Sequence, residues 1–458
     1  MPRPNILFIT TDQQRYDSVA CYGNPHVKTP NLDQLASSGV RFDLCYAPNP
    51  VCAPTRAAIY TGRWPHVCGV WANGVDLPRH ERLFTRILAD AGYDCGITGK
   101  VHLGGCANGR VEPRLDDGYR VYEWAHHPGN DWGDKNAWWK WLQSQPPEPP
   151  RPDPPYPIAM GGVGWPRELH FTHWAAERTI EFIRSARRPF FAWMSLFDPH
   201  HPFDPPLEHL EMYDPAQVPR PKYKPGELDR KPWFHREGHL KTYRRGRGFV
   251  EFSPDEIQGM VAAYYGMVSL IDDEVGRVLD ALDSFGLADD TLVVFTSDHG
   301  DMLGDHGMLL KGPFFYEGAV RVPLIMRWPG EMAEGTVVDE LVSLVDLTAT
   351  FLQAADLQPL RTMQSISLLP AARGEPWDPR GWVMSLYRES ETPRIPPVHA
   401  TMLRTDRYKL VVHHGARDGE LYDLEADPDE FDNLWWDSRY RDVKGELLHR
   451  LIDAFWST

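Results

Sequence analysis

A cysteine begins the short motif Cys-Ala-Pro-Thr-Arg at residues 52–56. Proline is favoured in the first turn of a helix, so the motif predicts a helix that begins close to Cys52. The N-terminal end of a helix favours negative charge, and Arg56 lies one turn farther along the same face. The motif therefore predicts an anion site beside a thiol, although a reduced cysteine at such a position is also a common small core residue.

Metal-binding residue types follow two predicted buried strands. Asp12 and Gln13 come after a strand at residues 5–10, and Asp298 and His299 come after a strand at residues 291–296. Ligands in open α/β sheets gather at the carboxyl ends of the strands. Carboxylate and amide oxygens suit Ca²⁺ or Mg²⁺, and an imidazole also admits Mn²⁺. Each pair alone is equally compatible with a simple strand-end turn, but together they predict a metal site.

Two lysines supply candidate cationic groups. Lys100 and His102 lie in the glycine-flanked segment 99–104, directly after a predicted strand at residues 94–98. Glycines beside these residues indicate that the backbone approaches another group closely. Lys311 follows the loop that contains Asp298. An isolated lysine is ordinarily a solvated surface residue, but this context favours a role for Lys100 in the site.

A pair of histidines, His200 and His201, follows another predicted strand at residues 190–196. Histidine titrates near neutral pH, so one member of the pair is a candidate general acid. We expect His200 to take this role and the other histidine to be structural. Three strand ends, those before Asp12, His200 and Asp298, thus bring reactive residue types to one edge of one sheet.

The elements that must position these residues alternate between strand and helix. This alternation predicts an α/β architecture with a mostly parallel sheet. The expected strands are 5–10, 94–98, 190–196 and 291–296, and the expected helices begin at Pro30 with Thr29 as cap, at residue 83, at residue 172 and at Pro254 with Ser253 as cap. Much of residues 120–250, rich in tryptophan, proline and tyrosine, is expected to form long ordered loops.

The last hundred residues have a different pattern. A strand pair is expected at residues 401–413 around a turn at Thr405 and Asp406, then an extended segment at 419–425 and a closing helix at 444–455. We therefore predict an α/β domain over residues 1–355, with a large mixed and mostly parallel sheet flanked by helices. A smaller α+β subdomain with an antiparallel sheet is predicted over residues 356–458.

Composition narrows the possible partners. The net charge of −16 argues against nucleic acid and anionic membranes, so an anionic substrate needs a local basic pocket. No apolar run reaches the roughly 20 residues of a membrane span, and the chain passes from Met-Pro-Arg-Pro straight into a strand. The protein is therefore expected to be cytoplasmic. The cysteines show no pattern of a disulfide scaffold, and the five other than Cys52 are expected to be reduced packing residues.

Taken in order, the motifs resemble the sulfatase family of the alkaline-phosphatase superfamily over most of the chain. Gln13 and His299 depart from the commonest sulfatase pattern, which has a second aspartate and an asparagine at these places. This variant is similar to phosphonate monoester hydrolases and to some bacterial sulfatases. The matching segments are residues 5–12, 52–56, 61–63, 99–104, 199–202, 297–300, 311, 316–323 and 421–428.

The resemblance implies that Cys52 is oxidised to formylglycine by a maturation enzyme and hydrates to a gem-diol. A divalent metal would then lower the pKa of one hydroxyl, which attacks sulfur to form a covalent sulfo-enzyme. The implied metal ligands are Asp12, Gln13, Asp298, His299 and residue 52. Ca²⁺ is the ion that the resemblance favours, with Mn²⁺ or Mg²⁺ as alternatives.

The resemblance also implies roles for the remaining residues. Lys100, Arg56 and the metal would hold the sulfuryl oxygens. His200 would protonate the leaving alcohol while Lys311 neutralises charge on the ester. His102 would take the proton of the second hydroxyl, and the carbon–oxygen bond would then break to release sulfate. Asn73 is expected to contact the substrate at the edge of the sulfate.

Three functions remain open from the sequence. The first is hydrolysis of an aryl, carbohydrate or alkyl sulfate monoester. The second is hydrolysis of a phosphonate monoester or phosphodiester, because these substrates also present a tetrahedral group with a single negative charge. The third is a non-catalytic metal-binding protein in which Cys52 is never oxidised, which the intact set of acids and cations argues against.

The basic patch at residues 244–247 is either a lid over an anionic substrate or a solvated loop. Whether the chain forms a homo-oligomer also stays open.

Overall fold

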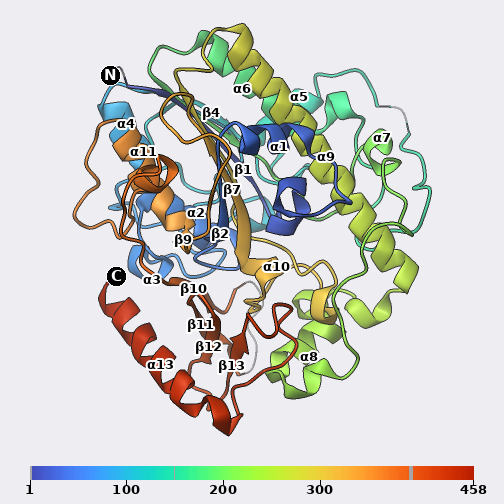
Figure 1. Cartoon of the computed structure of the whole chain (residues 1–458). Helices are drawn as coiled ribbons and strands as arrows, with labels where there is room; N and C mark the ends of the chain where they lie inside the picture. The colour runs from blue at the N-terminus through green and yellow to red at the C-terminus, as the bar shows by residue number, and fades with distance from the viewer. Residues whose placement is uncertain (1–2, 149, 391–395) are drawn as a thin grey trace.

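The computed structural model describes residues 3–148, 150–390 and 396–458. Within these residues, nine strands form one sheet in the order β4-β3-β5-β1-β6-β7-β2-β8, and β9 pairs with β2 beside this path (Figure 1). The strands are β1 (Asn5–Thr11), β2 (Val40–Tyr46), β3 (Asp94–Gly99), β4 (Tyr119–Trp124), β5 (Phe190–Ser195), β6 (Thr291–Ser297), β7 (Arg321–Arg327), β8 (Thr336–Val338) and β9 (Val342–Ser343).

The centre of this sheet is parallel. β1 pairs with β5 and β6 in parallel, and β3 pairs with β4 and β5 in the same way. Only β7 runs antiparallel to its neighbours, β6 and β2. The prediction of a mixed, mostly parallel sheet is confirmed. Because these strands run parallel, their carboxyl ends lie at one edge of the sheet, where polar loops begin. The five strands are β1, β3, β4, β5 and β6.

Helices cover both faces of the sheet, and the alternation of β1 shows why. Ile6 and Phe8 point into one apolar core, whereas Leu7 and Ile9 point into another. The first core is closed by α2 (Cys52–Thr61), α4 (Phe84–Asp90), α11 (Leu347–Ala354) and α12 (Leu369–Ala372). The second is closed by α1 (Pro30–Ser37), α5 (Ala137–Leu142), α6 (Phe171–Ser185) and α9 (Pro254–Ser284).

The helix starts expected in the α/β region hold to within one residue, and one of the two predicted caps differs. Ser253 caps α9 as predicted, because its hydroxyl accepts from Glu256 N and the Glu256 carboxylate accepts from Ser253 N. Thr29 precedes α1 but makes no side-chain cap to it. Its hydroxyl instead accepts a hydrogen bond from Ala20 N at 2.8 Å, so it fixes the preceding loop.

A second, antiparallel sheet follows near the C-terminus, as predicted. Its order is β10 (Val383–Arg388), β11 (His399–Arg404), β12 (Tyr408–His413) and β13 (Gly419–Asp423). Helix α13 (Arg441–Trp456) packs on it through Leu447 and Leu451, and begins three residues before the expected start. The domain division at residues 355 and 356 stays a prediction. The remaining helices are α3 (Pro65–Cys68), α7 (Leu207–Leu210), α8 (Trp233–Leu240) and α10 (Glu317–Val320).

A buried lysine joins the small sheet to the large one. Lys409 on β12 is fully buried and forms ion pairs with Glu317 at 2.8 Å and with Glu430 at 2.6 Å. Its Nζ also donates to the carbonyl of Phe315 at 2.8 Å. A buried charge is tolerated only when it is paired, so this cluster fixes how β12 meets the α10 region.

All six cysteines lie within the described residues, and none forms a disulfide; the five other than Cys52 were expected to be reduced packing residues. Of the five other than Cys52, only Cys21 is partly exposed. In the part of the chain that the structure describes, no helix has both the length and the apolar character needed to cross a membrane.

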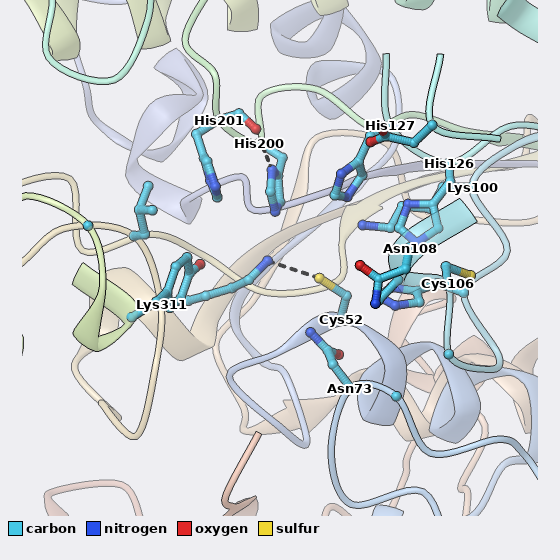
Figure 2. Close-up of a pocket in the computed structure, with 18 of the residues that line it drawn as sticks. Cys52, Asn73, Lys100, Cys106, Asn108, His126, His127, His200, His201 and Lys311 are labelled. Atoms are coloured by element: carbon cyan, nitrogen blue, oxygen red, sulfur yellow. Dashed lines mark hydrogen bonds between the residues drawn. The ribbon is translucent and has the colours of Figure 1, made fainter. Parts of the chain in front are cut away.

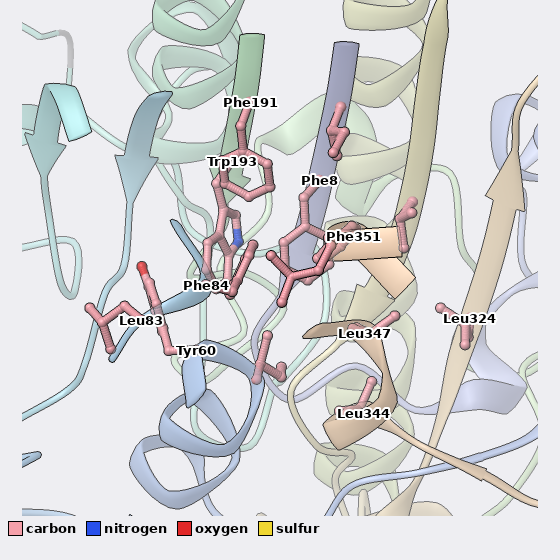
Figure 3. Close-up of a cluster of buried hydrophobic side chains, with 14 of the residues drawn as sticks. Phe8, Tyr60, Leu83, Phe84, Phe191, Trp193, Leu324, Leu344, Leu347 and Phe351 are labelled. Atoms are coloured by element: carbon pink, nitrogen blue, oxygen red, sulfur yellow. The ribbon is translucent and has the colours of Figure 1, made fainter. Parts of the chain in front are cut away.

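Aromatic rings fill the core beneath the sheet on the α2 side (Figure 3). The ring centroids of Phe8 and Phe351 lie 4.9 Å apart, and those of Phe8 and Trp193 lie 4.6 Å apart. Phe84 stacks on Phe351 at 5.3 Å. Helices α4 and α11 are thus fixed against β1 and β5 by contacts among side chains that exclude water.

We predict that Phe351→Ala lowers the free energy of unfolding by about 3–5 kcal/mol, because it removes a buried ring and leaves a cavity. Thermal unfolding followed by circular dichroism measures the effect. Leu360→Ala is the matched control, since Leu360 is 40% exposed. Equal melting temperatures for the two variants would contradict this description of the core.

Candidate active site

Cys52 is the first residue of α2 and lies at the base of a cavity at the carboxyl edge of the large sheet (Figure 2). The first turn of the helix is fixed by neighbouring side chains. Ala53 N donates to Asn73 Oδ1 at 3.0 Å, and Thr55 Oγ1 donates to Asn49 O at 2.8 Å. The predicted helix start is confirmed, and Asn73 both lines the cavity and caps this turn.

Acidic and imidazole groups surround the thiol. The candidate ligand atoms of Asp12, Cys52, Asp298 and His299 all lie within 4.8 Å of one another and are buried. Cys52 Sγ lies 3.1 Å from His299 Nε2 and 3.5 Å from Asp12 Oδ1. The loops after β1 and β6 deliver the two aspartates, as the strand-end argument predicted.

The ring of His299 has the orientation expected of a histidine that binds a metal. Its Nδ1 lies 2.8 Å from the carbonyl oxygen of Gly300, which accepts hydrogen bonds only, so Nδ1 carries the proton. In the neutral ring Nε2 is then an unprotonated donor atom that faces Cys52 and the carboxylates. This arrangement, in which the second nitrogen is fixed by a carbonyl, is usual for metal-bound histidine.

Gln13 is a candidate further ligand, and its backbone has an uncommon conformation. Its φ of 69° lies in the left-handed region, which is uncommon for a residue other than glycine. The side chain donates from Nε2 to Asp301 Oδ2, while Oε1 is buried and has no hydrogen-bond partner among the described residues. Two carboxylates, an imidazole nitrogen and an orphaned amide oxygen therefore fit a divalent cation.

Arg56 lies behind the two carboxylates. Its Nε donates to Asp298 Oδ2 at 2.8 Å and its Nη2 donates to Asp12 Oδ2 at 3.2 Å. Nη1 is occupied by the carbonyl of Lys100 at 3.0 Å and by Ser195 Oγ at 2.8 Å. These contacts fix the carboxylates, so in this structure the guanidinium is paired with the acids of the candidate metal site. Its contact with the sulfuryl group stays a prediction.

Two lysines face the thiol and the acids. Lys100 Nζ pairs with Asp12 Oδ2 at 2.6 Å, and Lys311 Nζ lies 3.0 Å from Cys52 Sγ. Burial and Asp12 act to raise the pKa of Cys52, but Lys100, Lys311 and His299 outweigh them and lower it to about 6. The centre therefore favours an anion at position 52 and in the space directly above it.

The predicted histidines also line this cavity. His200 Nδ1 donates to the carbonyl of His201 at 2.7 Å, which leaves Nε2 as the second reactive position of the ring. Burial, together with Lys311 and His201, holds the pKa of His200 well below its ordinary value. Burial and the nearby Lys100 do the same to the pKa of His102. Both rings are therefore neutral at pH 7 in the free chain.

Glu112 fixes the segment that contains His102. Its buried carboxylate accepts from His102 N at 2.8 Å, from Leu103 N and from Trp124 Nε1 at 2.8 Å. His102 has a φ of 57°, so these bonds hold the backbone in a conformation that it would otherwise rarely adopt. The contact spans only ten residues, but no motif in the sequence indicated it.

The cavity has a volume of about 780 Å³ and collects residues from four strand ends. Six predicted residues line it: Cys52, Asn73, Lys100, His102, His200 and Lys311. His126 and His127 also line it and were missed by the sequence reasoning. They directly follow Ala125 after β4, so the rule that found Asp12 applies to them, but the charged Arg120 and Glu123 hid that strand.

Comparisons with known proteins place the chain among sulfatases. The family model described as Sulfatase matches residues 4–357, and a model described as the C-terminal part of N-sulphoglucosamine sulphohydrolase matches residues 304–455. An uncharacterised sulfatase, YidJ, of Escherichia coli strain K12 is 30% identical over 476 residues, which cover 99% of this chain and 87% of that protein. An arylsulfatase of Clostridium perfringens strain 13 is 30% identical over 480 residues, covering 98% and 94%.

A solved structure is similar over the whole chain. The phosphonate monoester hydrolase of Agrobacterium radiobacter superposes with a TM-score of 0.85 at 27% identity. The match covers 98% of this chain and 95% of that one. Both the large mixed sheet and the small antiparallel sheet therefore belong to a known architecture.

We predict that Asp301→Asn weakens divalent-cation binding about tenfold, in the range usual for groups that orient metal ligands. The two carboxylate oxygens of Asp301 accept from Gln13 Nε2 and from Leu303 N. An asparagine has one oxygen, so one of these donors would meet an NH₂ group, and the hydrogen bond that fixes the side chain of Gln13 would be lost or weakened. Isothermal titration calorimetry with Ca²⁺ and Mn²⁺ measures the change.

Asp305→Asn is the matched control for this experiment. Asp305 is another acid of the same loop, but it pairs with Arg15 and with Lys222 N. Unchanged affinity in Asp301→Asn, or equal loss in both variants, would contradict the role given to Asp301.

Proposed function

The chain belongs to the sulfatase family, and we propose that it hydrolyses a sulfate monoester to an alcohol and inorganic sulfate with a formylglycine made from Cys52. It is a sulfuric ester hydrolase. The observation that carries the proposal is the position of Cys52, buried at the start of α2 between Lys311 and His299 and open to the cavity. Residue 52 thus faces both the candidate metal ligands and the anion site.

Two groups that the sequence does not encode, a modified residue 52 and a bound cation, supply part of the chemistry. A formylglycine provides, as its hydrate, a hydroxyl nucleophile and a second hydroxyl for release of sulfate, and a bound divalent cation makes the nucleophile available at neutral pH. Asp12, Gln13, Asp298 and His299 would hold the cation. We propose Ca²⁺, with Mn²⁺ as the alternative because of the imidazole and Mg²⁺ as a further one. The proposal also requires a formylglycine-generating enzyme as a maturation partner.

The lysines bind and orient the sulfate group. Lys100 and Lys311 approach the space above residue 52 from opposite sides, as Figure 2 shows, and so can contact different sulfuryl oxygens. Arg56 holds Asp12 and Asp298 in place through its ion pairs. The sulfate is thereby fixed with its ester oxygen toward the wide part of the cavity.

His200 and His102 move the protons in this proposal. The Nδ1 proton of His200 is bound to a carbonyl, so Nε2 is the atom that delivers a proton to the leaving oxygen. The neutral ring must first gain that proton, and a bound sulfate favours it because a nearby negative charge raises the pKa of histidine. His102, whose backbone is held by Glu112, receives the proton of the second hydroxyl of residue 52; the carbon–oxygen bond to sulfate then breaks, sulfate leaves and the aldehyde is restored.

A second candidate activity is hydrolysis of a phosphonate monoester or a phosphodiester. Gln13 and His299 favour it, because this pair was the part of the sequence that resembles phosphonate monoester hydrolases. The structural similarity to such an enzyme from Agrobacterium radiobacter agrees with that. The cationic side chains of the cavity are compatible with both activities, because each substrate presents a tetrahedral group with one negative charge.

We predict that Cys52→Ala and Cys52→Ser both abolish turnover while leaving the melting temperature within about 2 °C of the parent. A serine would accept the sulfuryl group but lacks the second hydroxyl, so its ester cannot collapse, and we expect at most one equivalent of alcohol to be released. Steady-state release of 4-nitrophenol from 4-nitrophenyl sulfate measures this. Cys21→Ala, away from the cavity, is the control that should remain active; normal turnover by Cys52→Ala would refute the mechanism.

A substrate comparison separates the two activities. We predict a kcat/KM for 4-nitrophenyl sulfate at least tenfold above the values for 4-nitrophenyl phenylphosphonate and bis(4-nitrophenyl) phosphate. All three release the same alcohol, so differences arise from the transferred group. A higher value for either phosphorus ester would establish the second candidate activity in place of the first.

A further inference from the structure

A loop between α8 and α9 carries three arginines, and the structure separates their surroundings. The Nε atom of Arg244 lies 3.2 Å from Glu237 Oε1. The Nη1 atom of Arg247 lies 3.8 Å from Glu256 Oε1. Arg245 instead lines the cavity above Cys52 and is exposed, and it forms no ion pair with any residue that the structure describes. The arginine between the two paired ones is therefore the one that a ligand of the cavity can reach.

The backbone of this loop has an uncommon conformation. The φ angles of Tyr243 and Arg244 are 47° and 63°, both in the left-handed region. The amides of Arg245 and Gly246 donate to the carbonyl of Thr242 at 3.2 and 2.9 Å. Two successive residues in this region are costly, and such conformations cluster at functional sites. The tight turn places residue 245 on the cavity wall, whereas residue 244 is not part of that wall.

The end of the loop is fixed against helix α8. A Cβ atom added to Gly248 would lie 2.2 Å from the carbonyl carbon of Leu240, so only glycine allows this approach. The amide of Gly248 also donates to Glu251 Oε2 at 2.9 Å. The basic patch that the sequence left open as a lid or a solvated loop is therefore a fixed part of the cavity wall.

The cavity has more cationic groups than a sulfate group alone requires. Lys100 and Lys311 lie beside Asp12 and Cys52 and so belong to the sulfate end. Arg245 adds a guanidinium that stays charged at every physiological pH. The cavity volume of about 780 Å³ is in the range of sites that enclose a whole small molecule, so the alcohol portion of the substrate also lies within it.

An acid, Asp131, also lines the cavity, but it does not neutralise Arg245. It is exposed, lies on the segment after β4, and forms no ion pair with Arg245. The chain has a net charge of −16, yet no carboxylate of the described residues pairs with this guanidinium. An exposed cation that faces a ligand cavity favours a negative group on the ligand.

We propose that Arg245 is a specificity-determining residue that binds a second oxyanionic group, such as a carboxylate, on the alcohol portion of the substrate. This inference rests on the proposed sulfate ester hydrolysis. The planar guanidinium can donate two parallel hydrogen bonds to a carboxylate, which a point charge cannot do. The preferred substrate is then a dianion whose sulfate lies between Lys100 and Lys311. Arg245 has no role at the reacting atoms, so esters of neutral alcohols remain substrates.

The first test compares aryl sulfates that differ in charge but hardly in shape, using enzyme that carries formylglycine. The panel pairs 3-carboxyphenyl, 4-carboxyphenyl and 4-(carboxymethyl)phenyl sulfate each with its carboxamide. The carboxamide releases the more acidic phenol, so intrinsic reactivity favours the neutral ester. We expect kcat/KM for at least one carboxylate to exceed that of its carboxamide about tenfold, the size of one charge-assisted contact.

The second test measures the same ratio in variants of the loop. Arg245→Gln removes the charge, and we expect the ratio for the best pair to fall about tenfold. Arg245→Lys keeps a charge without the planar fork and should retain part of the preference. Arg247→Gln is the matched control, because it makes the same charge change in the same loop at a residue that faces Glu256. We expect it to change the ratio by less than about twofold, since salt screens a distant exposed charge.

The outcomes separate this inference from the proposed function. Turnover of the esters without a carboxylate preference in any pair would overturn the inference and leave sulfate ester hydrolysis intact. A preference that survives in folded Arg245→Gln, or that falls equally in Arg247→Gln, would overturn the assignment to Arg245. No turnover of any ester, charged or neutral, would remove the proposed function itself and the inference with it.

Discussion

The site depends on the mutual neutralisation of charges that the fold has removed from water. Asp12 and Asp298 are buried, and Arg56 and Lys100 are buried against them at distances of 2.6–3.2 Å. An unpaired charge at such a depth would be strongly destabilising, so each partner requires the others. Lys311 adds a further buried cation, whose Nζ lies 3.0 Å from the Cys52 thiol, 3.4 Å from His299 Nε2 and 3.9 Å from Asp12 Oδ1. The cluster therefore attracts an anion at the position where chemistry is proposed.

The large sheet makes this cluster possible. Parallel strands end at a common edge, so residues far apart in sequence meet there without long loops. β1 and β6 deliver the acids, β3 delivers Lys100, and β4 and β5 deliver the histidines of the wider cavity. The edge of one sheet thus positions these groups.

The sequence predicted the structure best where the local pattern of residues alone determines both the element and the position of the residue that follows it. The apolar runs of β1 and β6 predicted the strands, and their ends located Asp12 and Asp298. β4 was missed because Arg120 and Glu123 interrupt its apolar residues, and with it His126 and His127 were missed. Contacts such as Glu112 with the backbone of His102 were beyond prediction, because they depend on how two loops pack rather than on residue type or spacing. Asp301 directly follows the recognised motif at residues 297–300, but its partner, Gln13, is 288 residues away.

The central claim is that residue 52 is a formylglycine. Fragment-ion mass spectrometry of the tryptic peptide 42–56, from protein made in its native host, tests it most directly. The fragments must separate Cys52 from Cys45, which lies in the same peptide and serves as an internal reference. We expect an aldehyde at position 52 and an intact thiol at position 45. An unmodified thiol at position 52 in all molecules of active protein would contradict the formylglycine assignment.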